Sequence, residues 1–314
     1  MTKRFIHWPQ AAYWQSKPIR FRFRASNSET VQNRRASKAK CKKHSPSFQV
    51  SASFITVLAG GVILFMAFRG QRNPVADTGQ ELTARQIVYE VVDNYPHDPT
   101  AFLQGLLWSE GDFYESTGLH GQSTLRRIEF PSGKILKSIS LPFELFGEGI
   151  ALADKRLIQL TWKSKRGLVY DRDSFVLLRE FRYETEGWGI TYDGKHLVMS
   201  DGSSDLTYLD PDSFAPVRKL SVVMNGRPID NLNELEYIEG EIWSNVWQTD
   251  LILRINPATG QVTSFLNLKG ILPAGMRTGN EDVLNGIAYD VQQKRIFVSG
   301  KLWPRIFEIR VKGK

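Results

Sequence analysis

The stretch Phe146-Gly147-Glu148-Gly149-Ile150 places one carboxylate between two glycines, directly before an apolar run. Glycine adopts backbone conformations that other residues avoid, and it lets neighbouring groups approach closely. A single Gly-Glu-Gly sequence is most often a turn with a solvated glutamate, since short motifs are weak signals. Here the same local pattern returns at four other places in the chain, with a different residue in the position of Glu148.

The repeated pattern is a polar or aromatic residue, a central residue that is glycine in four of the five copies, and then an apolar run. Successive centres are 44, 40, 45 and 52 residues apart. A repeat of about 45 residues has the length of one four-stranded blade of a β-propeller. The five copies are Gln104-Gly105-Leu106, Glu148-Gly149-Ile150, Trp188-Gly189-Ile190, Asn233-Glu234-Leu235 and Asn285-Gly286-Ile287.

Each repeat continues as short runs of β-branched and aromatic residues, and no convincing amphipathic helix interrupts them. Turns rich in Pro, Asp and Asn follow the third run, as β-turns require; they lie at residues 130–133, 171–174, 210–213 and 256–260. Strands are predicted at residues 87–92, 125–130, 157–161, 168–170, 196–199, 206–209, 242–246, 252–255, 295–298 and 306–311.

The last repeat has room for only three strands, and we expect residues 87–92 to supply its fourth strand and close the ring. The sequence therefore predicts an all-β fold, a five-bladed β-propeller over residues 87–314. The alternative is a double-sheet sandwich, but a sandwich does not explain one motif that is repeated five times.

The N-terminal residues 1–49 hold 12 of the 41 basic residues and one acidic residue, Glu29. We predict a basic, largely disordered cytosolic tail, although its composition also resembles a plastid or mitochondrial transit peptide. The rest of the chain, with 29 basic and 32 acidic residues, has no basic excess for binding nucleic acid. The only cysteine, Cys41, lies in the tail, so the following domain contains no disulfide and no thiolate metal site.

Residues 50–68 are uncharged and mostly apolar. As a helix they would span about 28 Å, close to the hydrocarbon thickness of a bilayer. A buried helix would have nothing nearby to pack against, and a cleaved signal peptide has a much shorter basic region before its apolar core. We expect a transmembrane signal anchor, with the basic tail in the cytosol, and a linker at residues 69–86. The expected location is the endoplasmic reticulum or Golgi membrane, single-pass type II with a lumenal catalytic domain; the alternative is a plastid.

Chemistry is expected where the repeats converge, because the first strand of every propeller blade lines the central channel. The equivalent residues are Gln104, Glu148, Trp188, Asn233 and Asn285, and the ends of the second strands add Trp162, Asp201, Trp247 and Lys301. Polar groups that converge in an aromatic-walled pocket are typical of a binding or active site. A poorly solvated Glu148 is suited to act as a base near neutral pH.

Several site types are not supported by the sequence. The domain has no Gly-x-Ser-x-Gly elbow, no thiol nucleophile and no phosphate-binding loop. Its histidines, His97, His120 and His196, are far apart in sequence and form no recognisable zinc motif.

Residues 87–312 resemble the plant-type glutaminyl-peptide cyclotransferases, which are five-bladed propellers unrelated to the zinc-dependent animal enzymes. The resemblance rests on eight motifs: Phe102-Leu-Gln-Gly105, Phe146-Gly-Glu-Gly149, Leu160-Thr-Trp-Lys163, Glu186-Gly-Trp-Gly189, Leu232-Asn-Glu-Leu-Glu236, Asn245-Val-Trp247, Leu284-Asn-Gly-Ile-Ala288 and Gly300-Lys-Leu-Trp-Pro304. It implies a transferase that cyclises the N-terminal glutamine of peptides and proteins to pyroglutamate and releases ammonia.

The resemblance also implies roles for individual residues. Glu148 would shuttle the proton from the attacking amine to the leaving nitrogen, while Lys301 and Asn233 would hold or polarise the amide and its oxyanion. Gln104 would orient the substrate, and no metal or cofactor is implied. The pocket walls would be Phe102, Phe146, Trp162, Trp188 and Trp247.

Two other functions fit the predicted fold. A non-catalytic propeller could bind peptides in the same channel, and it would need the aromatic walls but not Glu148 and Lys301. A lactonase-like propeller hydrolase usually holds a metal on the axis, here through Glu148, Asn233, Asn285 and Asp201, but Gln104 and the tryptophans fit that reading poorly.

Overall fold

The computed structural model describes residues 83–312, and these form five antiparallel sheets of four strands each, with additions at one edge. The sheets are β3–β6 (Leu103–Ser109, Asp112–Thr117, Thr124–Glu129, Ile135–Ser140), β7–β10 (Gly147–Ala153, Arg156–Thr161, Arg166–Asp171, Leu177–Arg182), β11–β14 (Ile190–Tyr192, Leu197–Met199, Asp205–Leu209, Pro216–Ser221), β17–β20 (Leu232–Ile238, Glu241–Val246, Leu251–Ile255, Val262–Asn267) and β21–β23 (Leu284–Asp290, Arg295–Gly300, Arg305–Lys312) with β2 (Val88–Pro96). A small hairpin, β15 (Val223–Met224) and β16 (Arg227–Pro228), lies between two of them in sequence.

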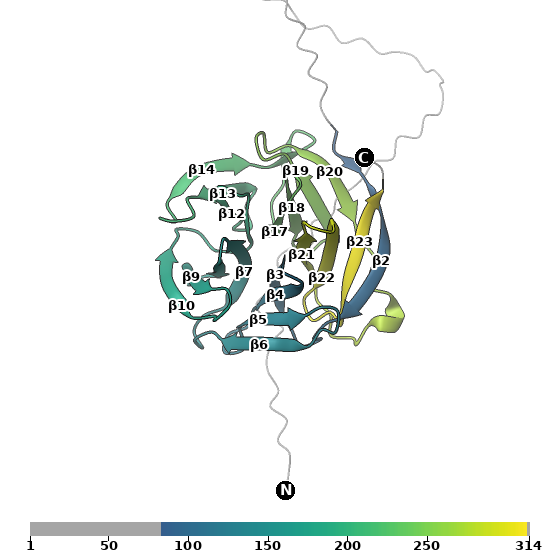
Figure 1. The fold of residues 1–314 in the computed structure, drawn as a ribbon. Helices are drawn as coiled ribbons and strands as arrows, with labels where there is room; N and C mark the ends of the chain where they lie inside the picture. The colour runs from purple at the N-terminus through teal and green to yellow at the C-terminus, as the bar shows by residue number, and fades with distance from the viewer. Residues whose placement is uncertain (1–82, 313–314) are drawn as a thin grey trace, which may run out of the picture. The chain divides into compact units, whose positions relative to one another are not determined.

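The sheets surround a common centre, with β3, β7, β17 and β21 innermost (Figure 1). The predicted five-bladed propeller is therefore confirmed. Strand β2 pairs antiparallel with β23, from Val88 opposite Lys312 to Pro96 opposite Arg305, so the last blade is completed by a strand from the start of the domain. This is the closure that residues 87–92 predicted.

One strand was not predicted. The residues Arg85–Gln86 form β1, which pairs in parallel with β20 at the outer edge of the fourth blade. They fall within the expected linker at 69–86. They join the fold because Ala84 and Ile87 on either side are buried in the domain core, which fixes the short segment between them against β20.

The central glycines of the repeat lie where the inner strands of neighbouring blades touch. A Cβ atom added to Gly105 would lie 2.6 Å from the backbone nitrogen of Ile150, and one added to Gly149 would lie 2.7 Å from the Cα of Gly189. A Cβ on Gly189 would overlap the carbonyl oxygen of Asn233. In these three repeats glycine is required because backbone atoms fill the space that a Cβ would occupy. The fourth central glycine, Gly286, has a φ of +116°, a conformation that favours glycine.

The fourth blade has Glu234 at the glycine position, and its side chain connects three blades. Its carboxylate accepts the backbone N–H of Leu106 at 3.3 Å and that of Ile287 at 2.9 Å. Two residues later, Glu236 accepts the N–H of Tyr289 at 3.1 Å. Burial raises the pKa of Glu234 well above its ordinary value, and the charge of Glu236 raises it further. Glu234 thus replaces close backbone contact with hydrogen bonds across the axis.

The predicted basic tail at 1–49, the predicted signal anchor at 50–68 and the first part of the linker lie outside the described residues. Within residues 83–312, no helix is long and apolar enough to cross a membrane. The helix found in this range is η1 (Ala274–Met276), in the connection before β21.

Candidate active site

The polar residues predicted from the repeat are buried at the starting ends of the inner strands. Gln104, Glu148, Asn233 and Asn285 occupy β3, β7, β17 and β21, each at the second position of its strand. The side-chain amide of Asn285 donates to the Gln104 side-chain oxygen at 3.4 Å, so these two blades meet at the axis. The amide oxygens of Asn233 and Asn285 are buried and accept no hydrogen bond from the described residues.

Glu148 and Trp188 belong to neighbouring blades that are joined by the backbone. The N–H of Gly149 donates to the carbonyl oxygen of Trp188 at 2.7 Å. Around the axis the order is therefore Glu148, then Trp188, then Asn233, whose carbonyl group abuts Gly189. The repeat predicted this convergence of side chains, and the inner strands produce it.

Glu148 and Lys301 form a buried, electrostatically coupled pair. Each is 5% exposed. Burial raises the pKa of Glu148 well above its usual range; the positive charge of Lys301 lowers this pKa, and the negative charge of Glu186 raises it further. Burial lowers the pKa of Lys301, and the charge of Glu148 opposes that shift. Burial therefore shifts the two pKa values toward each other, and the attraction between the two opposite charges opposes both shifts.

The Lys301 loop is fixed to both neighbouring segments. Its backbone N–H donates to the carbonyl of Val283, and its own carbonyl accepts from Asp282, both at 3.0 Å. The N–H of Leu302 donates to the carbonyl of Ala101 at 2.8 Å. The ammonium group of Lys301 then lies 4.9 Å from the ring centre of Phe102.

The predicted wall residues are partly exposed, whereas the polar residues of the inner strands are buried. Phe146 contacts Phe102 edge-on, with ring centres 6.2 Å apart, and lies 5.5 Å from Trp162. Trp188 and Trp247 form a second edge-to-face pair at 5.5 Å. All five predicted wall residues therefore belong to two aromatic groups.

Glu186 joins these two aromatic groups. One of its carboxylate oxygens, Oε2, accepts the indole N–H of Trp162 at 2.6 Å and that of Trp188 at 3.0 Å. Glu186 lies in the Glu186-Gly-Trp-Gly189 motif, and no role was predicted for it from the sequence. The available signal was its position two residues before Trp188, but spacing alone does not show that both indoles turn toward one carboxylate.

A buried ion pair, His97 with Glu115, lies close in sequence to two site residues, Phe102 and Lys301. His97 lies between two acceptors, the carbonyl of Trp303 at 2.7 Å from Nδ1 and the carboxylate of Glu115 at 2.9 Å from Nε2. A carbonyl and a carboxylate as the two acceptors favour the doubly protonated ring. Burial lowers the pKa of His97, but the hydrogen bond and charge of Glu115 and the Trp303 carbonyl outweigh it, so the net pKa is raised. His97 ties the segment before Phe102 to the segment after Lys301.

The other candidate ligands have separate roles. Asp201 caps a local turn by accepting the N–H of Ser203 at 3.0 Å and its hydroxyl at 2.6 Å. His120 lies over Phe146, with ring centres 5.5 Å apart, and His196 lies 3.9 Å from Asp193. Among residues 83–312, no group of three or more His, Cys, Asp or Glu side chains is arranged to hold a metal ion.

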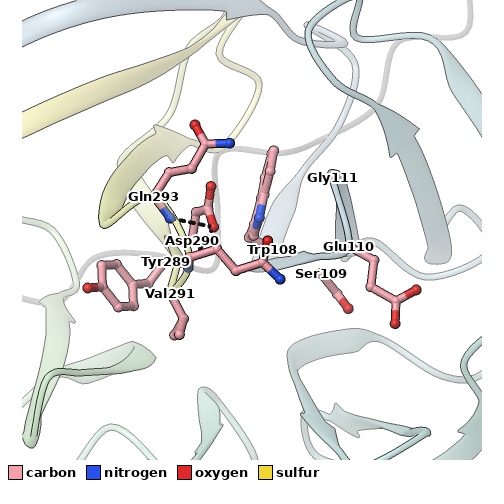
Figure 2. Close-up of a pocket in the computed structure, with 9 residues that line it drawn as sticks. Trp108, Ser109, Glu110, Gly111, Tyr289, Asp290, Val291 and Gln293 are labelled. Atoms are coloured by element: carbon pink, nitrogen blue, oxygen red, sulfur yellow. Dashed lines mark hydrogen bonds between the residues drawn. The ribbon is translucent and has the colours of Figure 1, made fainter.

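A separate cleft of about 310 Å³ lies at the opposite ends of β3 and β21. Figure 2 shows its lining, which runs from Trp108 to Gly111 and from Tyr289 to Gln293. The carboxylate of Asp290 in this cleft is already bonded to the Arg295 guanidinium at 2.8 Å and to the backbone of Gln293. None of the predicted site residues lines this cleft, so it is distinct from the candidate active site.

The comparisons with known proteins agree with the geometry. Residues 64–311 match the family model described as glutamine cyclotransferase. The chain is 40% identical over 264 residues to the glutaminyl-peptide cyclotransferase of Arabidopsis thaliana, with 82% of each chain covered. It is also similar to the crystal structure of Myxococcus xanthus glutaminyl cyclase, with a TM-score of 0.68 and 39% identity over 73% of this chain and 98% of that one. The resemblance predicted from the sequence is thus confirmed, and the chain belongs to the glutamine cyclotransferase family.

Proposed function

We propose that this protein is a transferase that converts the N-terminal glutamine of peptides and proteins to pyroglutamate and releases ammonia. The observation that carries the proposal is the buried Glu148–Lys301 pair, which lies beside two aromatic groups in a chain of this family. The expected partner is therefore a peptide with a free N-terminal glutamine.

The proposed reaction begins with attack of the α-amine nitrogen on the side-chain amide carbon, which forms the ring C–N bond. Glu148 accepts a proton from that nitrogen and then gives it to the amide nitrogen as the C–N bond to the leaving group breaks. One molecule of ammonia leaves, and no net proton is consumed. A carboxyl group with a raised pKa suits both transfers, because a general acid–base works best when its pKa is close to the working pH.

Two residues are proposed to stabilise the reacting amide. We assign the Lys301 ammonium group to stabilising the oxyanion, because it is buried and water screens its charge little. The amide oxygen of Asn233, which is buried and accepts no hydrogen bond from the described residues, suits an N–H group of the substrate amide. Gln104, held by Asn285, is proposed to orient the same amide.

Ring closure is intramolecular, so much of the rate gain comes from holding the glutamine side chain in its folded conformer. We propose that Phe102, Phe146, Trp162, Trp188 and Trp247 provide this restriction and limit the access of water. Charge stabilisation and proton transfer are both assigned to side chains, and we propose that the reaction needs no metal.

We further propose a membrane location, which rests on the sequence alone. Residues 50–68 would anchor the protein as a single-pass type II membrane protein of the endoplasmic reticulum or Golgi, with the propeller in the lumen; a plastid location is the alternative. Protease protection of the propeller in intact microsomes, lost on adding detergent, would separate the two.

A direct test uses two peptides that differ only in the α-amine, a Gln-initiated peptide and its N-acetylated form. We expect release of one equivalent of ammonia and the matching mass loss from the first peptide, and no reaction of the second. Equal binding of both peptides without turnover would instead favour a non-catalytic peptide-binding propeller.

A further inference from the structure

The Glu186 carboxylate has a well-defined position among the aromatic residues. Its Oε2 atom is shared by the indole N–H groups of Trp162 and Trp188, at 2.6 and 3.0 Å. These two tryptophans come from different blades. The Trp188 ring also packs directly against Gly202, where an added Cβ atom would lie 2.7 Å from the ring. Two donors on one oxygen fix the carboxylate relative to both rings.

The charges of the site leave Glu186 unbalanced. Glu148 and Lys301 contribute no net charge, whether both are ionised or the proton has passed from Lys301 to Glu148. Two exposed groups nearby, Lys163 over the Trp162 ring and Asp282 beside Lys301, have opposite signs. Among residues 83–312, Glu186 forms no ion pair with a Lys, Arg or His side chain, so its carboxylate can still receive a cation.

The substrate of the proposed reaction carries a suitable cation. An α-amino group has a pKa of about 7.7–8.0, so at neutral pH a free N-terminus is largely an ammonium group. Aromatic faces with an adjacent carboxylate are a recurrent receptor for ammonium ions. We propose that Glu186 is the anionic recognition group for the α-ammonium of the substrate, held in position by Trp162 and Trp188; this inference rests on the proposed cyclisation.

This role is separate from catalysis of proton transfer. The bound ammonium must first release one proton to solvent, which leaves a neutral amine that can attack. A second proton then passes from the attacking nitrogen through Glu148 to the leaving amide nitrogen, as proposed above. Glu186 takes no part in the proton transfer and stays bonded to the two indoles. Glu186 therefore selects substrates with a free amine and holds that amine near the base.

The test uses Glu186→Gln, since glutamine keeps an oxygen that can accept both indole N–H groups but removes the negative charge. Binding is measured by calorimetry with two probes that cannot cyclise, an Ala-initiated tripeptide and the same peptide with a lactyl group, in which a hydroxyl replaces the ammonium. The wild-type protein should bind the ammonium probe about tenfold more tightly than the hydroxyl probe, the range for a hydrogen bond to a charged group. Glu186→Gln should lose this preference and keep its affinity for the hydroxyl probe.

Two control variants isolate the charge at this position. Glu184→Gln removes an exposed carboxylate two residues away and should leave the preference intact. Glu186→Asp keeps the charge on a shorter side chain and should retain part of the preference. The proposal is overturned if Glu186→Gln weakens the binding of both probes equally, or of neither probe. Glu186 would then act only by orienting the indoles. Binding is measured without turnover, so failure of the cyclisation reaction itself would be seen separately, as a lack of ammonia release by the wild-type protein.

Discussion

Replacing Gly149 by alanine tests the contact between neighbouring inner strands. The new Cβ would lie 2.7 Å from both the Cα of Gly189 and the nitrogen of Ile190, and 2.8 Å from the carbonyl oxygen of Trp188. Ordinary contact begins at 3.4 Å, so the second and third blades must separate locally by about 0.7 Å. All three obstructing atoms belong to the backbone and cannot turn aside as a side chain would.

The separation acts on stability and on activity. Overpacking of this kind costs about 1–3 kcal/mol, which lowers the melting temperature by about 2–4 °C per kcal/mol for a domain of this size. It also moves Glu148 away from Trp188, and a misplacement of about 1 Å costs about a hundredfold in rate. We therefore expect kcat/KM for a Gln-initiated peptide to fall by about tenfold to a hundredfold.

Thermal unfolding and ammonia release are measured side by side on Gly149→Ala and on a matched control. Gly275→Ala is the control, because a Cβ there meets nothing within 4 Å and its backbone conformation suits alanine. The control should behave as wild type. A Gly149→Ala protein with unchanged melting temperature and kcat/KM would show that the inner strands are not in tight contact, and the explanation given for the repeated glycine would be wrong.

Three further predictions concern pH and buried charge. Burial raises the pKa of Glu236 from 4.5 to about 8, so the free energy of unfolding should fall as pH rises from about 4.5 to about 8. Urea unfolding at pH 5 and pH 8 should show a smaller fall in this free energy for Glu236→Gln than for wild type. An equal fall in the two proteins would contradict the assignment. Glu115→Gln removes the partner of the buried His97 imidazolium and should lower the free energy of unfolding by about 3–5 kcal/mol. Because the pKa of His97 is raised, its contribution to stability should be present at pH 5 and should fade as the pH rises above the usual histidine value. A variant as stable as wild type at pH 5 would contradict the ion pair. The profile of kcat/KM against pH should be bell-shaped. Its acid limb should lie above pH 4.5 because the pKa of Glu148 is raised, and its alkaline limb below pH 10.5 because the pKa of Lys301 is lowered; both apparent pKa values belong to the pair. Limbs at the ordinary pKa values of the two groups would argue against the buried pair.

The fold was predictable because the repeat carries a physical constraint at each copy. Glycine reflects backbone contact between blades at Gly105, Gly149 and Gly189, and a positive φ at Gly286. The missing strand in the last repeat pointed to closure by residues 87–92. The strand β1 was not predictable, because two residues carry no period and Arg85–Gln86 are held by the burial of their neighbours.

The candidate site was predictable only where residues occupy repeat positions. Glu148 and Lys301 follow from the blade geometry, but the role of Glu186 depends on how two indole rings turn, which spacing does not determine. The sequence shows Glu234 as a departure from the glycine pattern. Its hydrogen bonds to two other blades could not be predicted, because they form only when the ring of blades is closed. The pairing of His97 with Glu115 and Trp303 is equally non-local.

The most direct test of the account compares wild type with Glu148→Gln on a Gln-initiated peptide, by ammonia release and mass spectrometry. Glutamine keeps the shape of the side chain but cannot take up the proton, so kcat should fall by about 10²–10⁴-fold, with the melting temperature and peptide affinity retained. Cyclisation by a folded Glu148→Gln protein at the wild-type rate would contradict the account, because the proton would then be carried by another group.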